Sequence, residues 1–469
     1  MTLPLRLALI LTVLLLGGCE SARELPLLDQ VHLRGNLLIM TRNSPTTYYE
    51  GVEGPAGFEY DLVSRFAESL DVEVEFIVPN SFETILPTIS AGEADFAAAG
   101  LTITEARKKR VRFTTSYQQI TQQLLYFKGI PHPKTLADLE GYTLEVVAGS
   151  SHVENLQRKK RGLPSLGWTE NSDHGIEDLI FLLKERLIDY TVADSNEVAL
   201  HRNYYPELRV AFDLTDPEPL GWAFRKGKDT SLYDAAQTFL KDIQDSGELA
   251  HLIERHYGHA EQFNYVDRRA FRRDMFSRLI PYQPEFVKAA KTNELDWRLL
   301  AAIGYQESHW NPKAVSPTGV RGIMMLTQAT AKQMGVKKRT DPIQSIHGGA
   351  RYFARVKNKI PQRIQEPDRT WMALAAYNIG FGHLEDARRL TQAGGNNPDL
   401  WVDVKKSLPL LNQKKWYKKT RYGYARGRES VRYVDNIRSY HDILTWTVQQ
   451  YSEPEEGSEF SYPALSPAL

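Results

Sequence analysis

One carboxylate in the second half of the chain occupies a position where an apolar side chain is expected. Glu307 lies four residues after Ile303 and seven after Leu300, so on a helix the three share one face. Asp296 can cap the start of this helix, and the pair at residues 311–312, Asn-Pro, can end it. Burial raises the pKa of a carboxyl and keeps a proton available near neutral pH, as a general acid requires. Glu307 is therefore a candidate general acid, with a buried ion pair or a surface position as the structural alternatives.

Three segments of the second half follow one another and include Glu307. They read ESHWNPKAVSPTGVRGIMMLT, AAYNIGFG and YVDNIRSY. In this order they resemble the motifs of the lytic transglycosylases that have a goose-type lysozyme-like fold. The resemblance implies that Glu307 is the catalytic acid. It also implies that these residues bind substrate: Ser308, Ser316, Met324, Met325, Tyr377, Asn378 and Tyr433.

One position departs from the pattern of that family. The usual Gly-Leu-Met-Gln reads Gly-Ile-Met-Met at residues 322–325, so Met325 replaces a glutamine. A thioether is a much weaker hydrogen-bonding group than an amide. Because the flanking motifs are intact, we interpret the change as subfamily variation that weakens a sugar contact.

Ordinary glycosidases use two carboxylates, but no second one stands out in these segments. The nearest acids, Asp296 and Asp341, lie at a probable helix cap and in a turn. The resemblance implies a route that needs only Glu307, which protonates the β-1,4 oxygen between N-acetylmuramic acid and N-acetylglucosamine. The muramoyl N-acetyl group assists, and Glu307 then takes the C6 hydroxyl proton as a 1,6-anhydro ring closes. A lysozyme-type hydrolase with the same glutamate and a non-catalytic cell-wall or amino-acid binding receptor are the alternatives.

Two phenols are the groups expected to act beside this glutamate. Tyr377 and Tyr433 are predicted to hold Glu307 and to orient the acetamido group through their hydroxyls. Asn378 is expected to fix the local backbone. A core position on an alanine-rich helix is the alternative for Tyr377.

The first half alternates short β-rich runs with helical stretches. Strands are expected at 36–41, 72–78, 94–99, 143–147 and 189–193. This rhythm predicts two lobes, each with a mostly parallel sheet and ligand loops at the strand ends. We expect the chain to cross between the lobes near residues 127–131 and 213–222, which would make a hinged cleft.

Two segments of this half, GFEYDL and GLTITEARKKRVRFTTSY, closely resemble the periplasmic solute-binding proteins for polar amino acids. The resemblance implies that Arg107 grips a ligand carboxylate after a turn made by Gly100 and Thr102, and that Asp194 holds the ammonium. A planar guanidinium suits a carboxylate. Other positions implied in ligand binding are Tyr48, Ser150 and Ser151, the serines at a helix N-terminus. A solvated Arg107 in the RKKR run and a degenerate domain that serves as a spacer are the alternatives.

After Asp267 the β-rich runs cease, and helical patterns follow at 271–279, 284–292, 296–309, 342–359, 370–379 and 430–450. The predicted fold class is therefore multidomain: a two-lobed α/β domain like the periplasmic binding proteins, then an α-rich lysozyme-like domain. The predicted bounds are 33–257 for the first domain, 258–267 for the linker and 268–451 for the second. The acidic tail at 452–469 is expected to be disordered.

The chain opens with an apolar run from Leu7 to Leu16 that is about half as long as a bilayer span. It reads as a signal peptide of residues 1–18, followed by an N-terminal tether at 19–32. The sequence Leu-Gly-Gly-Cys at 16–19 resembles the lipobox of bacterial lipoproteins, which implies lipidation of Cys19. The next residue is Glu20 and not the aspartate that resembles an inner-membrane retention signal. The expected location is therefore the periplasmic face of the outer membrane. A plain signal peptide is the alternative.

The composition bounds the remaining possibilities. A chain of 469 residues is too long for one ordinary core, and 58 basic against 58 acidic residues do not suggest a nucleic-acid partner. One cysteine permits no thiolate cluster, and three histidines, His251, His256 and His259, do not share a helical face. We therefore expect no metal and no cofactor. The expected partners are peptidoglycan strands, wall-derived muropeptides or amino acids at the first domain, and the outer membrane.

Overall fold

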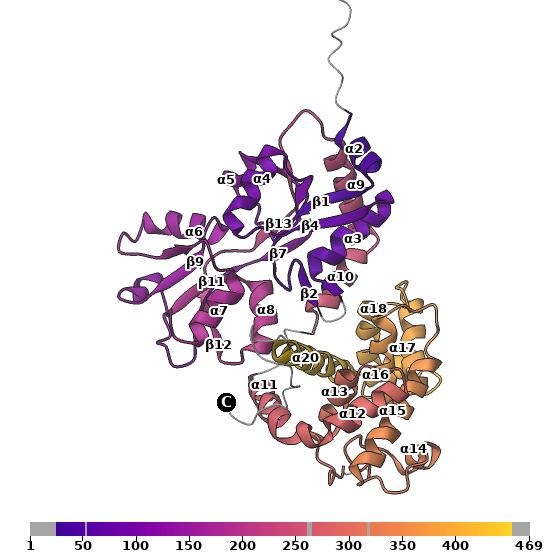
Figure 1. Cartoon of the computed structure of the whole chain (residues 1–469). Coiled ribbons are helices and arrows are strands. Elements are labelled where there is room, and N and C mark those ends of the chain that lie inside the picture. Colours follow the sequence, from indigo (N-terminus) through magenta and orange to yellow (C-terminus); the bar gives the residue numbers. More distant parts are fainter. Residues whose placement is uncertain (1–24, 52–53, 260–264, 317–318, 453–469) are drawn as a thin grey trace, which may run out of the picture.

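The computed structural model describes residues 25–51, 54–259, 265–316 and 319–452. The predicted signal peptide, Cys19 and the acidic tail from 453 onwards lie outside these residues. In the described part of the chain, no helix combines the length and the hydrophobicity needed to cross a bilayer. Two bodies follow one another along the chain, a two-lobed α/β domain and a helical domain (Figure 1).

The first lobe is built on a five-stranded sheet in the order β4-β1-β5-β14-β6. Strand β1 pairs in parallel with β4 and β5, while β14 is antiparallel to both of its neighbours. Helices on the two faces complete two buried apolar clusters. The strands are β1 (Asn36–Met40), β4 (Glu73–Ile77), β5 (Phe96–Ala97), β6 (Val111–Phe113) and β14 (Ala223–Arg225), with a small hairpin of β2 (Tyr49–Gly51) and β3 (Gly54–Ala56). The helices are α3 (Phe58–Leu70), α4 (Ile85–Ala91), α5 (Glu105–Lys108), α9 (Ser231–Asp245) and α10 (Glu248–Tyr257).

The second lobe has its own five-stranded sheet, in the order β10-β9-β11-β8-β12. Its strands are β8 (Gln122–Phe127), β9 (Leu144–Val147), β10 (Thr169–Asn171), β11 (Tyr190–Asp194) and β12 (Leu208–Asp213). Its helices are α6 (Ser151–Lys160), α7 (Ile176–Lys184) and α8 (Ser195–Tyr204).

The chain crosses between the lobes at β7 (Gln118–Ile120) and β13 (Glu218–Leu220), which pair with each other in an antiparallel sense. The second crossing was predicted correctly. The prediction of the first near residues 127–131 was wrong, because β8 already lies inside the second sheet between β11 and β12. An apolar run such as β8 reports burial but not which sheet it joins.

The segment expected to tether the domain is partly folded. Helix α2 (Leu27–Arg34) buries Val31, and the backbone N–H groups of Leu27 and Leu28 donate to Asp229 and Ser231 beside α9. Residues 27–32 therefore belong to the first lobe.

The second body is helical, and in its described residues only isolated β-bridges occur. Helix α13 packs between α12 and α20, and Leu300 and Ile303 are fully buried on its inward face. The predicted multidomain fold, α/β first and α-rich second, is confirmed. The helices are α11 (Tyr265–Asp274), α12 (Gln283–Thr292), α13 (Trp297–Ser308), α14 (Gln328–Gln333), α15 (Pro342–Lys359), α16 (Asp368–Ile379), α17 (Phe381–Ala393), α18 (Trp401–Ser407), α19 (Lys414–Tyr417) and α20 (Gly427–Ser452).

Helix α20 lies at the junction between the two bodies (Figure 1). Its Arg438 donates to Glu254 of α10 at 2.7 Å, and both side chains are buried. Its Trp446 stacks on Tyr204 of α8 with the ring centroids 5.1 Å apart. One helix of the second body therefore packs on both α8 and α10 of the first.

Candidate active site

Glu307 lies in the last turn of α13, directly after the buried stripe that precedes it. Asp296 caps the helix as expected, since its carboxylate accepts from the backbone N–H of Arg298 at 2.8 Å. Glu307 is part-buried, and this burial raises the pKa of its carboxyl to about 7. Among the described residues it takes part in no ion pair, so a proton on Glu307 is available near neutral pH.

Tyr433 is the side chain that contacts this glutamate. Its hydroxyl donates to Oε1 of Glu307 at 2.7 Å and opposes part of the rise in the pKa of Glu307. Tyr433 reaches the site because α20 packs along α13, where Asn436 also donates to Gln306 at 3.1 Å. The arrangement orients one carboxyl oxygen and leaves the other without a protein hydrogen bond in the described structure.

Ser308, the residue after Glu307, is used by the protein backbone. Its hydroxyl donates to the carbonyl of Ile323 at 2.8 Å and so ties α13 to the loop that follows it. Gly322, the residue before Ile323 in this loop, has φ of 85°. A Cβ atom at this position would lie 1.9 Å from the carbonyl oxygen of Arg339. Only glycine fits this close approach.

Tyr377 was expected to hold Glu307, but its hydroxyl donates to the carbonyl of Met324 at 3.1 Å. It thus fixes the same loop as Ser308, although it lies near enough to Glu307 for that carboxylate to raise the pKa of the phenol, after burial as the main cause. The side chain of Met324 is fully buried against Gly304 and Gly349. Its side chain therefore packs in the core beside this loop and is not exposed at the site.

The remaining predicted substrate residues lie around this loop. Met325 is part-buried and has φ of 44°, an uncommon value for a residue other than glycine. Ser316 accepts from the backbone N–H of Val320 at 3.2 Å and closes a turn. Asn378 is exposed at the end of α16.

Other acids near α13 have structural partners. Asp296 also pairs with His441 at 2.7 Å, and Asp341 caps α15 by accepting from the N–H of Gln344 at 2.9 Å. The three histidines considered for a metal each face a different carboxylate: His251 faces Asp368, His256 faces Asp61 and His259 faces Asp442. No group of metal-binding side chains forms within the described ranges.

Most of the predicted ligand residues of the first domain meet between the lobes. Gly100, Arg107, Ser150, Ser151 and Asp194 line one small cavity of about 20 Å³. Thr102 lies beside it and accepts from the hydroxyl of Ser151 at 3.0 Å.

Arg107 is only 3% exposed, so the interpretation of a solvated surface arginine is wrong. Its guanidinium donates to Glu154 of α6 at 2.8 Å and to the carbonyl of Gly149 at 3.0 Å, both in the second lobe. Asp194 faces His152 at 3.0 Å. The cationic and anionic groups expected for a ligand are thus bound to partners within the protein.

The sequence did not identify Arg42, Phe82 or Glu197 as cleft residues. Arg42 of the first lobe forms an ion pair with Glu197 of α8 and lies over the ring of Phe82, 5.7 Å from its centroid. Tyr48 stacks on Phe76 instead and does not line the cavity. The position of Arg42 just after the first strand was the available signal, since ligand loops follow strand ends.

Comparison with known families agrees with the division of the chain into an α/β domain and a helical domain. Residues 37–259 match the family "Bacterial extracellular solute-binding proteins, family 3", and residues 285–399 match the "Transglycosylase SLT domain". Among solved structures, an arginine-binding protein mutant from T. maritima is 27% identical with a TM-score of 0.45, covering 49% of this chain and 99% of its own.

Relatives of similar length carry both parts. The membrane-bound lytic murein transglycosylase F of Saccharophagus degradans is 47% identical over 96% of this chain and 91% of its own length. The protein of the same name from Ectopseudomonas mendocina is 47% identical over 96% of this chain and 92% of its own. The chain therefore belongs to the membrane-bound lytic murein transglycosylase F family of enzymes.

Proposed function

We propose that the helical domain cleaves the β-1,4 bond between N-acetylmuramic acid and N-acetylglucosamine of peptidoglycan without water and leaves 1,6-anhydromuramoyl ends. The observation that carries this proposal is the isolated Glu307 carboxyl, whose pKa of about 7 lets it give and regain a proton near neutral pH. Its described contacts include no second carboxylate to act as a base or nucleophile.

Each residue of the site has a role in this scheme. Glu307 gives its proton to the bridging oxygen as the glycosidic bond breaks, and the muramoyl N-acetyl oxygen stabilises the anomeric carbon. The Glu307 carboxylate then accepts the proton of the C6 hydroxyl, whose oxygen bonds to that carbon. Tyr433 stabilises the carboxylate between the two steps through its 2.7 Å hydrogen bond. Ser308 and Tyr377 hold the backbone of the 323–324 turn beside it.

Mass spectrometry of the products tests the reaction. We expect muropeptides released from purified peptidoglycan to lack the mass of one water relative to the hydrolytic products. A lysozyme digest of the same peptidoglycan provides the control, because it produces reducing ends. Reducing ends alone from the present enzyme would establish the hydrolase instead.

The cleavage rate should fall as pH rises through about 7, because the proton on Glu307 is lost above its pKa. Tyr433 donates to the charged form, so Tyr433→Phe should raise this pKa further and move the alkaline limb to higher pH. Profiles of kcat/KM against pH for both proteins measure the shift. A limb that moves to lower pH in the variant would contradict the assigned contact.

We also propose that Cys19 is lipidated and anchors the protein to the periplasmic face of the outer membrane. The lipobox-like sequence before Cys19 supports this assignment. Several acyl chains anchor a protein stably where one does not. Cys19→Ser should therefore move the protein from the membrane fraction to the soluble fraction, whereas Cys19→Ser protein that stays on the membrane would point to another anchor.

The first domain is proposed to bind wall-derived peptides or amino acids and to change the rate of the second. Helix α8 directly follows its N-cap, the cleft residue Asp194, and ends at Tyr204, which stacks on Trp446 of α20. The same α20 carries Tyr433, the partner of Glu307. A ligand that binds one conformation of the cleft more tightly would favour that conformation, and the contact of α8 with α20 could pass the change to Tyr433 and Glu307. A spacer role is the competing interpretation.

A further inference from the structure

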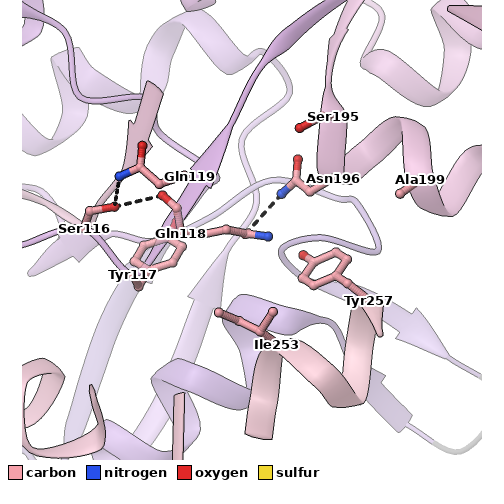
Figure 2. A pocket seen from close by; sticks show the side chains of 9 residues that line it. All are labelled: Ser116, Tyr117, Gln118, Gln119, Ser195, Asn196, Ala199, Ile253 and Tyr257. Atoms are coloured by element: carbon pink, nitrogen blue, oxygen red, sulfur yellow. Dashed lines mark hydrogen bonds between the residues drawn. The ribbon is translucent and has the colours of Figure 1, made fainter. Parts of the chain in front are cut away.

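A second cavity of the first domain lies at the crossing between the lobes, apart from the charged cleft. It has a volume of about 500 Å³ and is formed by β7, the start of α8 and the end of α10 (Figure 2). It shares no lining residue with the cavity around Arg107. Its size is within the range of small-molecule sites.

The lining of this hinge cavity offers mainly apolar surface, and its polar groups carry no charge. Hydroxyls come from Ser116 and Ser195, and amides come from Gln118 and Asn196. The Asn196 amide donates to Oε1 of Gln118 at 3.3 Å, and Figure 2 shows the Gln118 nitrogen between Asn196 and Tyr257. A charged ligand would lose its hydration here without gaining a counter-charge.

Tyr257 supplies a polar group that the protein itself does not satisfy. The residue is 8% exposed, and its hydroxyl makes no hydrogen bond within the described structure, although the Asn196 amide is close enough to influence its pKa, which burial raises. An unmatched buried hydroxyl is costly. Figure 2 shows this hydroxyl directed towards the cavity, with Ile253 adding an apolar surface.

We propose that the hinge cavity binds a neutral saccharide of the N-acetylhexosamine class. Such a sugar offers hydroxyls and an amide to Gln118, Asn196 and Tyr257, and it has apolar ring and methyl surfaces for Ile253. The hinge cavity is separate from the charged cleft around Arg107 and Asp194. It rests on the proposed function only in that cleavage of peptidoglycan would generate ends that carry this sugar.

A helix that lines the cavity also contacts the helical domain. Helix α10 contributes Ile253 and Tyr257 to the cavity, and its intervening residue Glu254 pairs with Arg438 and Lys405 of the helical domain. A bound sugar would therefore contact the same helix that carries Glu254 to the domain junction.

Hydrogen exchange of the full chain with N-acetylglucosamine as the probe tests the site. We expect saturable protection of the segments 116–121, 195–200 and 250–258. Tyr257→Phe, which removes only the hydroxyl, should weaken this binding about tenfold. Ala199→Trp should abolish the protection by filling the cavity, and Arg107→Ala should leave it unchanged. Glucosamine, which carries an ammonium in place of the acetamide, should bind at least about tenfold more weakly.

Two results would overturn the proposal. The first is protection confined to the helical domain, since the proposed catalytic site at Glu307 lies there. The second is protection at the hinge that Tyr257→Phe and Ala199→Trp both leave intact while each variant keeps the wild-type melting temperature. The product analysis of the helical domain is a separate readout, so failure of the proposed reaction would be recognised independently.

Discussion

Glu307→Gln is expected to lower the cleavage rate by about a thousandfold, because positioned general acid–base groups contribute roughly 10²- to 10⁴-fold. A glutamine amide cannot supply an acidic proton to the bridging oxygen. Its carbonyl oxygen still accepts from the hydroxyl of Tyr433, so the contact between α13 and α20 is retained. The folded structure should survive, since no ion pair is broken.

Release of soluble muropeptides from purified peptidoglycan measures this loss, and circular dichroism checks the fold. Glu294→Gln is the matched control, because Glu294 is an exposed glutamate two residues before the Asp296 cap of the same helix. The control should keep wild-type activity. A Glu307→Gln protein that retained wild-type activity would remove the assigned catalytic role.

Arg107→Ala should weaken ligand binding to the first domain by about a hundredfold, whereas Glu154→Gln should strengthen it about tenfold. The charge-assisted hydrogen bonds of one guanidinium to a carboxylate account for the first effect. The second follows because Glu154 occupies the guanidinium of Arg107 at 2.8 Å and competes with a ligand carboxylate. A competent state that is rarely populated lowers the apparent affinity in proportion.

Calorimetry of the full chain with purified wall peptides and their constituent amino acids measures these affinities. Glu105→Gln is the control, since Glu105 is an exposed acid on the same short helix as Arg107 that pairs with Lys108. If Glu154→Gln weakened binding as Arg107→Ala does, Glu154 would be part of the ligand site and not its competitor. Absence of binding across the whole set would leave the spacer role.

The effect of the ligand on the second domain is measured with the wild-type and Arg107→Ala proteins. Ligand should change the wild-type rate of peptidoglycan cleavage, and this change should disappear in Arg107→Ala. Binding without any change in rate would restrict the first domain to tethering or recruitment.

The inward face and the start of helix α13 could be predicted from residues close together in the sequence. The spacing of Leu300, Ile303 and Glu307 identified the inward face, and Asp296 identified its cap. Both depend on residues within two turns, where helix geometry fixes which side chains meet. For the same reason the strands predicted at 36–41, 72–78, 94–99, 143–147 and 189–193 lie near observed strands, although other strands of the first domain were not predicted.

Pairings between distant parts of the chain were not determined in this way. Tyr433 lies 126 residues from Glu307 and contacts it because α20 packs on α13, while the equally plausible Tyr377 turns to the carbonyl of Met324. Both phenols lie on predicted helices, and only the packing of whole helices distinguishes their partners.

The sequence by itself therefore determined the order of the two domains, the acid at the end of α13 and some of the cleft residues, among them Arg107 and Asp194. Only the tertiary structure decided what those groups face: Arg107 meets Glu154, Arg42 meets Glu197, and Tyr257 opens to a neutral cavity at the hinge. The physical reason is that backbone periodicity acts over a few residues. Ion pairs and cavities between lobes depend instead on how two separate sheets pack against each other.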